Sequence, residues 1–491
     1  MNGRSQNDKI ILGLKIKQFR TNQGFSLSDL RKKTGMSMSY LNEIEKGKKY
    51  PKQDKLELLA TALQLPYEEL VSTELPPKLE PIRELLNSNF LNDLPLDLFK
   101  IELVKIVEII ASAPAQVGAF ISTLVDLSKN YELQQESFYF AALRSYLELH
   151  NNYFEELEVK VKELIATYQL PESGWIQVEQ LASILEQRFG YTIIYNGLDT
   201  YPDLKQFRSV YIPKEKKLLL NSQLTDRQCA FQLGKELGFN YLNIKERAVT
   251  SSLLRAKSFN EILNHSKGIY FSVALLMNES DFIKDTQALF DMKQWNGSAF
   301  LEMMQKYGAS PEMFFHRFTN ILPKAFGLEK IFFTRMVHKS SSNHFEVDRE
   351  LHLDDRRYMS RNELNEHYCR RWVALSSLNA LKKEQKGHYT VSIQRSQHYA
   401  TQDEYLCLTI ARSAYPSPDR HVSTTLGMLI NAKVVEKIRF LNDQDIPKVV
   451  VNQTCERCPI RDCRERVAPP IIIQQKERKK QMQQALESLI K

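Results

Sequence analysis

Three cysteines near the end of the chain form the clearest chemical motif in the sequence. Cys455, Cys458 and Cys463 make a C-x-x-C-x4-C cluster, which brings three thiolates within reach of one metal centre. Such thiolates act as redox partners, as zinc ligands or as ligands of an iron–sulfur cluster. Three cysteines are one short of a four-thiolate zinc site, and no histidine lies inside the motif. We therefore predict a 4Fe-4S cluster that takes one further ligand, with zinc as the alternative.

Three other cysteines are available for the role of that further ligand. Cys369, in the segment HYCRRWVAL, is the candidate, although separation in sequence says nothing about distance in space. Cys229 lies in a patterned helix and Cys407 in an apolar, strand-like run, so both are expected to pack in the core. Disulfides are not expected, because a reducing cytoplasm disfavours them.

A second group of chemically capable residues lies in the segment LTDRQCAFQLGKELGFNYL, which is patterned as a helix. It resembles the His-Glu-Leu-Gly-His helix of the ImmA/IrrE-like metallopeptidases, where two histidines bind zinc and the glutamate activates a water molecule. Lys235 and Phe239 stand at the two histidine positions, and only Glu236 is kept. An ammonium group and a phenyl ring cannot ligate zinc. We therefore expect a pseudopeptidase with no catalytic residues, not an enzyme.

Two further segments extend this resemblance. GIYFSVALLMNESDF is similar to the family's second helix, and residues 304–318 are similar to the helix pair that closes the domain. The acidic third zinc ligand of the family is not evident, and Asn264 and His265 lie near its expected place. A lone histidine is more often a surface or hydrogen-bonded residue than a metal ligand, so we assign no metal to this region.

The N-terminal segment has the features of a DNA-binding unit. Residues 1–50 contain eleven Lys and Arg against four Asp and Glu, so nearly all of the net charge of +8 lies there. Residues 10–22 are patterned as a helix, Ser26 is expected to begin a second helix that Gly35 ends, and Ser37 a third. These are two short helices joined by a glycine-containing turn, and the second has a polar face and is followed by basic residues. Such a pair of helices suits the DNA major groove.

This stretch, above all the phrase SYLNEIEKGKKYP, resembles the helix-turn-helix of lambda-repressor-like (XRE) regulators. The resemblance implies that one group of residues faces base edges and nearby phosphates: Ser37, Met38, Ser39, Tyr40 and Asn42. It implies that a second group contacts the DNA backbone: Lys46, Lys48 and Lys49. Leu27 departs from the pattern, because the family often has glutamine at this position. The polar DNA contact that such a glutamine makes is then missing in this chain.

The whole chain is predicted to be a multidomain protein, mainly α with α+β parts. The expected order is an all-α helix-turn-helix domain, a helical connector, an ImmA/IrrE-like α+β domain, a mixed α/β sensor-like domain with the cysteine cluster, and a terminal helix. Their expected ranges are 9–72, 78–170, 175–322, 325–473 and 474–491. The long helices of the connector suit either pairing with a second subunit or packing within the chain.

These signatures together, with a tail of the form C-x-x-C-x4-C-x-x-R-x-x-P-P, resemble the short-chain fatty acyl transcriptional regulators. Cys369 and Trp372 are similar to a Cys-Pro-x-Trp segment of that family, with Arg370 in place of the proline. The resemblance implies control of propionate, acetate and methylcitrate metabolism, an acyl-CoA effector, and an iron–sulfur cluster held by the tail cysteines. Arg412 and Lys433 are examples of basic residues able to meet a CoA phosphate.

We therefore predict a sequence-specific DNA-binding transcription regulator of short-chain fatty acid and acyl-CoA metabolism that senses a metabolite or redox state. Expected partners are a double-stranded DNA operator, a small-molecule effector and further copies of the chain in a homodimer or higher homo-oligomer. The alternative is a zinc-dependent ImmA-like protease that acts on a repressor, which the replaced ligands disfavour. With no apolar run near the roughly 20 residues that span a bilayer and no secretory signal, we expect a cytoplasmic protein without a membrane partner.

Overall fold

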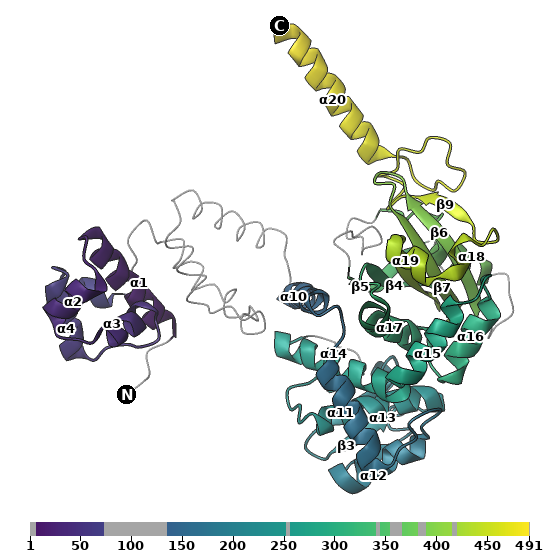
Figure 1. Cartoon of the computed structure of the whole chain (residues 1–491), viewed down its shortest axis with the longest axis horizontal. Coiled ribbons are helices and arrows are strands. Elements are labelled where there is room, and N and C mark those ends of the chain that lie inside the picture. Colours follow the sequence, from purple (N-terminus) through teal and green to yellow (C-terminus); the bar gives the residue numbers. More distant parts are fainter. Residues whose placement is uncertain are drawn as a thin grey trace. The chain divides into compact units, whose positions relative to one another are not determined.

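The structure is a computed structural model that describes residues 6–72, 135–251, 256–339, 344–353, 366–381, 389–414 and 420–490. The chain divides into two compact units, Met1–Ala142 with Ala256–Asn260 and Leu143–Arg255 with Glu261–Lys491 (Figure 1). Most of the predicted connector, residues 73–134, lies outside the described residues, and its expected role in dimerisation falls there too.

Five short helices lie between residues 6 and 72: α1 (Gln6–Asn22), α2 (Leu27–Thr34), α3 (Met38–Glu45), α4 (Gln53–Ala62) and α5 (Tyr67–Val71). Ser26 begins α2 with a capping box, in which its side chain and that of Asp29 each accept a backbone N–H. Gly35 ends α2 in the left-handed region at φ 71°, and the Ser37 side chain caps α3. These caps confirm the predicted limits of the two helices.

The inner faces of these helices share one core: Leu12, Ile16, Leu30, Met36, Leu41, Ile44, Leu56, Leu59, Ala60, Leu63 and Leu70. Gly13 allows α1 to approach α3, because a Cβ there would lie 2.4 Å from the Ile44 carbonyl oxygen. The buried Arg20 guanidinium joins the same helices, donating from Nε and Nη2 to the Glu45 carboxylate at 2.6 and 2.9 Å. Close packing and an ion pair thus fix the direction of α3 relative to α1.

The second unit opens with helices and a small sheet. The boundary between the units falls within α10 (Gln135–Leu149), and α11 (Glu155–Tyr168) and α12 (Val178–Phe189) follow. The three-stranded sheet has the order β1-β3-β2, with β1 (Thr192–Ile194), β2 (Ser209–Ile212) and β3 (Lys217–Leu220), and η3 (Pro202–Leu204) precedes β2. β2 and β3 form the predicted hairpin, since they pair antiparallel.

A run of helices carries the peptidase-like segments: α13 (Asp226–Tyr241), α14 (Phe259–Leu276), α15 (Glu279–Phe290), α16 (Gly297–Lys306) and α17 (Pro311–Ile321). The Thr225 side chain caps α13 and Ser310 caps α17, followed by a proline at its first position. A short π-helix, η4 (Leu322–Phe326), continues α17 and ends at Gly327 in the left-handed region.

A six-stranded sheet of order β5-β4-β8-β7-β6-β9 forms the C-terminal part of this unit. Its strands are β4 (Ile331–Lys339), β5 (Phe345–His352), β6 (Thr390–His398), β7 (Glu404–Ser413), β8 (Arg420–Leu429) and β9 (Lys448–Val451). All neighbours are antiparallel except β6 and β9. Between strands lie α18 (Val373–Leu381), α19 (Ala432–Lys437) and η5 (Arg439–Asn442). The mixed α/β character predicted for this region is confirmed.

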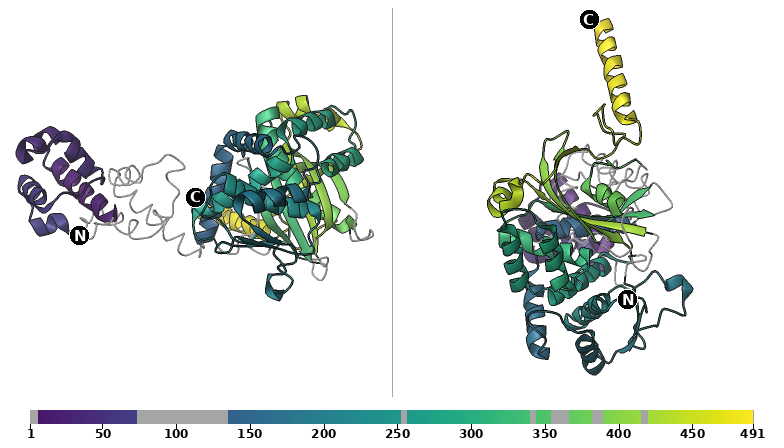
Figure 2. Two further views of the ribbon diagram at one scale, coloured as in Figure 1. Left: turned by 90° about the horizontal axis from the view of Figure 1, so that it is seen from below. Right: turned by 90° about the vertical axis from the view of Figure 1, so that its right-hand side faces the viewer.

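Helices cover both faces of the six-stranded sheet (Figure 2). Met336 and Cys407 lie in a core cluster with the apolar residues of α18. Side chains alternate along a strand, so Arg335, next to Met336, and Arg412, next to Ala411 of the same cluster, point to the opposite face. There both arginines bond to Glu312 of α17. One face is therefore apolar under α18, whereas the other carries charge under α17.

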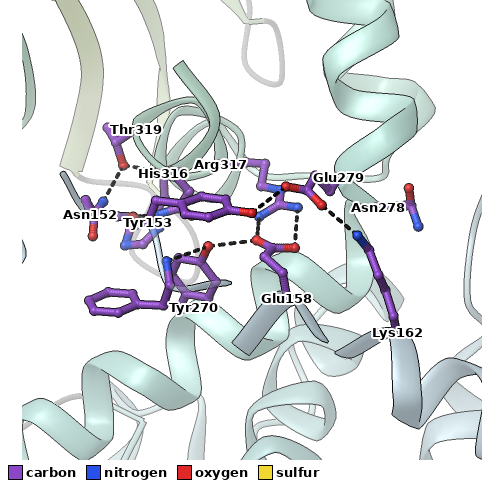
Figure 3. Close-up of polar contacts among 12 residues, drawn as sticks. Asn152, Tyr153, Glu158, Lys162, Tyr270, Asn278, Glu279, His316, Arg317 and Thr319 are labelled. Atoms are coloured by element: carbon purple, nitrogen blue, oxygen red, sulfur yellow. Dashed lines mark hydrogen bonds and ion pairs between the residues drawn. The ribbon is translucent and has the colours of Figure 1, made fainter. Parts of the chain in front are cut away.

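A buried polar network joins α11 to the peptidase-like helices (Figure 3). Arg317 of α17 is fully buried and donates to both carboxylate oxygens of Glu158 in α11, at 2.5 and 3.1 Å. The Tyr270 hydroxyl of α14 donates to the same carboxylate at 2.7 Å. Residues 143–170, assigned to the connector from the sequence, therefore lie within the second compact unit.

The last described element is α20 (Ile471–Ile490), a straight helix with no buried residue (Figure 2). It agrees with the terminal helix expected from the sequence. No helix among the described residues is long and apolar enough to cross a membrane.

Replacing Gly13 with alanine tests the α1–α3 contact. The new methyl group would meet backbone atoms of Ile44 and Glu45, which cannot rotate away, so the two helices must separate at a cost of about 1–3 kcal/mol. We expect faster hydrogen–deuterium exchange in α1 and α3 of the full chain. Thr21→Ala, an exposed change on the same helix, is the control. Unchanged exchange in the Gly13 variant would contradict the close approach.

Candidate functional site

The outer face of α3 is open to solvent where the sequence predicts DNA contacts. Ser37, Met38 and Ser39 are exposed, and Met38 retains 43% of its surface. Leu41 and Ile44 on the opposite face are buried in the helical core. Tyr40 and Asn42 are partly exposed at the edge of this face. The predicted base-facing residues therefore form one accessible surface at the N-terminus of α3.

The predicted backbone contacts lie directly after α3. Lys48 and Lys49 are exposed and Lys46 is partly exposed. The Lys49 ammonium forms an ion pair with Glu43 at 2.8 Å, and the hydrogen bond to Glu43 raises the pKa of Lys49. Glu43 therefore competes with DNA phosphates for this cation, which the sequence did not indicate.

One further cation at this surface was missed from the sequence. The Lys55 ammonium of α4 lies 4.5 Å from the centre of the Tyr40 ring, and that of Lys49 lies 5.7 Å from it. A cation over an aromatic face is attracted by the ring electrons. Because Lys55 is on a different helix, only its contact with the Tyr40 ring shows that it belongs to the same surface.

The peptidase-like helix α13 shows what replaces the zinc ligands. Phe239 is 1% exposed and its ring packs on Gly268 of α14, where a Cβ would lie 2.4 Å from a ring carbon. Lys235 is 2% exposed. Burial lowers the pKa of Lys235 to about 8. The two ligand positions of the family are thus filled by a packed ring and a buried amine.

Arg247 occupies the space between the retained glutamate and the phenyl ring. Its guanidinium bonds to the Glu236 carboxylate and donates to the Tyr191 hydroxyl at 2.9 Å. It also stacks over the Phe239 and Tyr211 rings, at 4.6 and 4.2 Å from their centres. Burial and the Glu236 charge raise the pKa of Tyr191, which keeps its hydroxyl protonated. Glu236 is therefore engaged in an internal ion pair, and no pattern in the sequence indicated Arg247.

His265 and Asn264 have different surroundings. Asn264 is exposed at its amide, which donates to the Glu246 carbonyl at 2.8 Å. His265 is buried, and its Nδ1 has no hydrogen-bond partner among the described residues. Burial, followed by the charges of Lys235 and Arg349, lowers the pKa of His265. His265 is therefore a buried residue, and the assignment of no metal to this region stays a prediction.

The candidate fourth ligand lies beside the cysteine tail. Cys369, Cys455 and Cys458 are buried and Cys463 is half-buried. The Cys369 N–H donates to the Gln453 carbonyl at 3.0 Å, two residues before the motif. The Cys455 N–H in turn donates to the His367 carbonyl at 2.8 Å, so the two segments lie side by side. Burial raises the pKa of the Cys369 thiol. The structure thus brings together residues 369 and 455 that the sequence separates widely.

Polar contacts hold the backbone of this cysteine loop. The Arg466 guanidinium donates to the carbonyls of Cys455, Cys458 and Ile460 at 2.7, 3.0 and 2.6 Å. The Trp372 indole donates to the Asn452 carbonyl at 2.7 Å. Within the described part of the chain, no group of three or more His, Cys, Asp or Glu side chains is arranged to hold a metal ion. The thiols fit an iron–sulfur cluster by their chemistry, and their roles as ligands stay predictions.

Comparisons with known proteins identify two domains. Residues 16–70 match the family of helix-turn-helix domains, and residues 186–319 match the IrrE N-terminal-like domain. Both confirm the domain types predicted from the sequence. A solved structure of a Mycobacterium tuberculosis transcriptional regulator is similar at 16% identity and a TM-score of 0.48, covering 67% of this chain and 94% of that one. No curated protein matches the chain.

Replacing Arg247 with methionine tests the ion pair inside the peptidase-like helix. The change leaves the Glu236 carboxylate buried without its partner, which costs about 3–5 kcal/mol. Tryptophan fluorescence during urea unfolding reports on the second unit, since Trp175, Trp295 and Trp372 all lie in it. We expect unfolding at lower urea, with partial recovery when Glu236→Gln is added. Equal unfolding of wild type and Arg247→Met would contradict the ion pair.

Proposed function

We propose that the protein is a sequence-specific DNA-binding transcription regulator. The observation that carries this proposal is the accessible face of α3, with Ser37, Met38 and Ser39 exposed at its capped N-terminus. A helix entering the major groove reads bases with residues of this kind. Lys48 and Lys49 stand beside that face and supply contacts to phosphates. The helix-turn-helix match over residues 16–70 implies DNA binding by the same surface.

We further propose that the second unit senses a metabolite or redox state and controls genes of short-chain fatty acid and acyl-CoA metabolism. The support is the resemblance carried by the C-x-x-C-x4-C-x-x-R-x-x-P-P tail together with the IrrE-like domain. An enzyme scaffold whose reactive groups are engaged elsewhere is free to bind a ligand instead. A homodimer or higher homo-oligomer and a cytoplasmic location belong to the same proposal.

The IrrE-like domain is proposed to be inactive as a peptidase. Lys235 and Phe239 cannot ligate zinc, and Arg247 neutralises the glutamate that would activate water. The competing function, zinc-dependent cleavage of a repressor, requires a metal at this place. Its signature is cleavage that needs zinc and disappears in Glu236→Gln.

We propose that the cysteine tail holds a 4Fe-4S cluster through Cys455, Cys458 and Cys463, with Cys369 as the fourth ligand. Its support is the pair of backbone hydrogen bonds that place residues 367–369 beside residues 453–455, together with the loop carbonyls that Arg466 holds. A bound cluster would supply sensitivity to oxidants or to iron supply. Zinc is the alternative occupant.

Two substitutions at the end of α3 test the DNA interface in opposite directions. Lys48→Ala removes a phosphate contact, so affinity falls and the slope of log K against log salt decreases by about one. Glu43→Gln frees Lys49 and removes a negative charge near the phosphates, so affinity rises. Gel shifts use DNA selected by the wild-type protein from a random library. Lys160→Ala, an exposed lysine paired with Glu163 in the second unit, is the control. Equal binding by all variants would contradict the interface.

The cysteine tail is tested on anaerobically purified protein. We expect iron and sulfide in a ratio near that of a 4Fe-4S cluster, with visible absorption that Cys455→Ser and Cys369→Ser abolish. Cys407→Ser should keep the colour, because Cys407 is fully buried in β7 among the apolar residues under α18. Colourless protein with stoichiometric zinc would replace the cluster with a zinc site.

A further inference from the structure

The segment before α18 meets the segment after β9 at the cysteine tail. Tyr368 and Thr454 form an antiparallel bridge between the two segments, and the backbone hydrogen bonds of Cys369 and Cys455 flank it. Side chains of successive residues alternate in such a pairing, so Cys369 and Cys455 both lie on the face opposite Tyr368 and Thr454. The two cysteines therefore depend on whatever holds these segments together.

The carboxylate of Glu366 crosses from the first segment to the second. It accepts a hydrogen bond from the Thr454 hydroxyl at 2.6 Å, and bonds from Nε and Nη2 of Arg457 at 2.8 and 2.7 Å. The Glu366 side chain is only 8% exposed. Burial would raise its pKa, but the bonds from Arg457 and Thr454 outweigh burial and lower it, so the carboxylate is charged. Hydrogen bonds to a charged group are roughly twice as strong as neutral ones.

The carboxylate of Glu456 crosses in the opposite direction. It accepts the His367 backbone N–H at 3.0 Å, and Nδ1 of the His367 ring lies 2.8 Å from it. Glu456 is buried. Each segment thus supplies one carboxylate and receives the other. These five residues are here named the carboxylate clamp: Glu366, His367, Thr454, Glu456 and Arg457.

The bonds of the carboxylate clamp do not use the cysteine thiols. Its carboxylates bond to hydroxyl, guanidinium, amide and imidazole groups instead. One carboxylate lies just before Cys369 in the chain, and the other lies between Cys455 and Cys458. The clamp therefore flanks the predicted metal ligands, and its bonds do not have to break when a metal binds to the thiols or leaves them.

We propose that the carboxylate clamp keeps Cys369 beside Cys455 both with and without a metal centre, so that the tail releases and regains its metal reversibly. This inference rests on the proposed metal site and gives that site a mode of regulation. Ligands that are already held in place bind a metal more tightly than ligands that must first be ordered, because the entropy cost has been met in folding. Glu366 and Glu456 are positioning residues, since they act through Cys369.

Cysteine labelling tests the position of Cys369 without a metal. The full chain is stripped with a chelator and treated with iodoacetamide, and mass spectrometry gives the reaction rate at each cysteine. We expect Glu366→Gln and Glu456→Gln each to raise the rate at Cys369 about tenfold or more, through the loss of charge-assisted hydrogen bonds. The rate at Cys407, which is fully buried in β7, should stay unchanged because the sheet remains folded.

Metal uptake then tests the link between the clamp and the site. Stripped protein receives ferrous iron and sulfide, or zinc, without oxygen, and the bound metal is measured in competition with a chelator. We expect both variants to hold the metal about 10- to 100-fold more weakly, as is typical when residues that orient metal ligands are changed. Glu404→Gln is the matched control, because its carboxylate is bonded to Arg395 and Lys448 in the same sheet. It should leave labelling and uptake unchanged.

Two labelling results would overturn the clamp. The first is an equal rate at Cys369 in wild type and both variants, and the second is an equal increase at Cys369 and Cys407, which reports a general loss of structure. Uptake separates the clamp from the metal site itself. Wild-type protein that takes up neither metal would remove the proposed site, whereas variants that hold the metal as firmly as wild type would remove the clamp alone.

Discussion

The buried ion pair between Arg317 and Glu158 is the contact on which the second unit depends. The guanidinium is fully buried and the carboxylate nearly so, and two hydrogen bonds join them. Tyr270 supplies a third donor to the carboxylate. Removing one partner of such a pair costs about 3–5 kcal/mol, because the other charge is left in the interior. Three helices, α11, α14 and α17, are thereby fixed to one point (Figure 3).

Helix α17 also connects this ion pair to the six-stranded sheet. Glu312 lies one and a half turns before Arg317 on the same helix and holds Arg335 and Arg412 on β4 and β7. The charges of Arg412, Arg335 and Arg208 outweigh the effect of burial and lower the pKa of Glu312, which keeps the carboxylate charged. α17 is held by ion pairs both at Glu312 and at Arg317, so it cannot shift without breaking them. The position of α17 therefore couples the IrrE-like helices to the sheet.

The sequence predicted those features that depend on neighbouring residues. Ser26, Gly35 and Ser37 mark helix ends because capping is local chemistry, and the hairpin of β2 and β3 follows from alternation around a turn. The substitution of Lys235 and Phe239 for zinc ligands was readable for the same reason, since one helix carries both. The sequence could not predict the roles of Arg247, Glu43 and the Arg317–Glu158 pair, because each acts through a partner that packing brings near. The burial of His265 could not be predicted from its own helix, because it depends on the helices that pack against it.

The buried glutamate of α13 also depends on a partner that packing brings near. Glu236 lies buried on α13, so without a cation beside it the carboxylate would stay uncompensated in the interior. Arg247 supplies that cation from a later segment and is itself held between two aromatic rings. The pair is neutral, so the charge of the buried Glu236 carboxylate is balanced from within the chain.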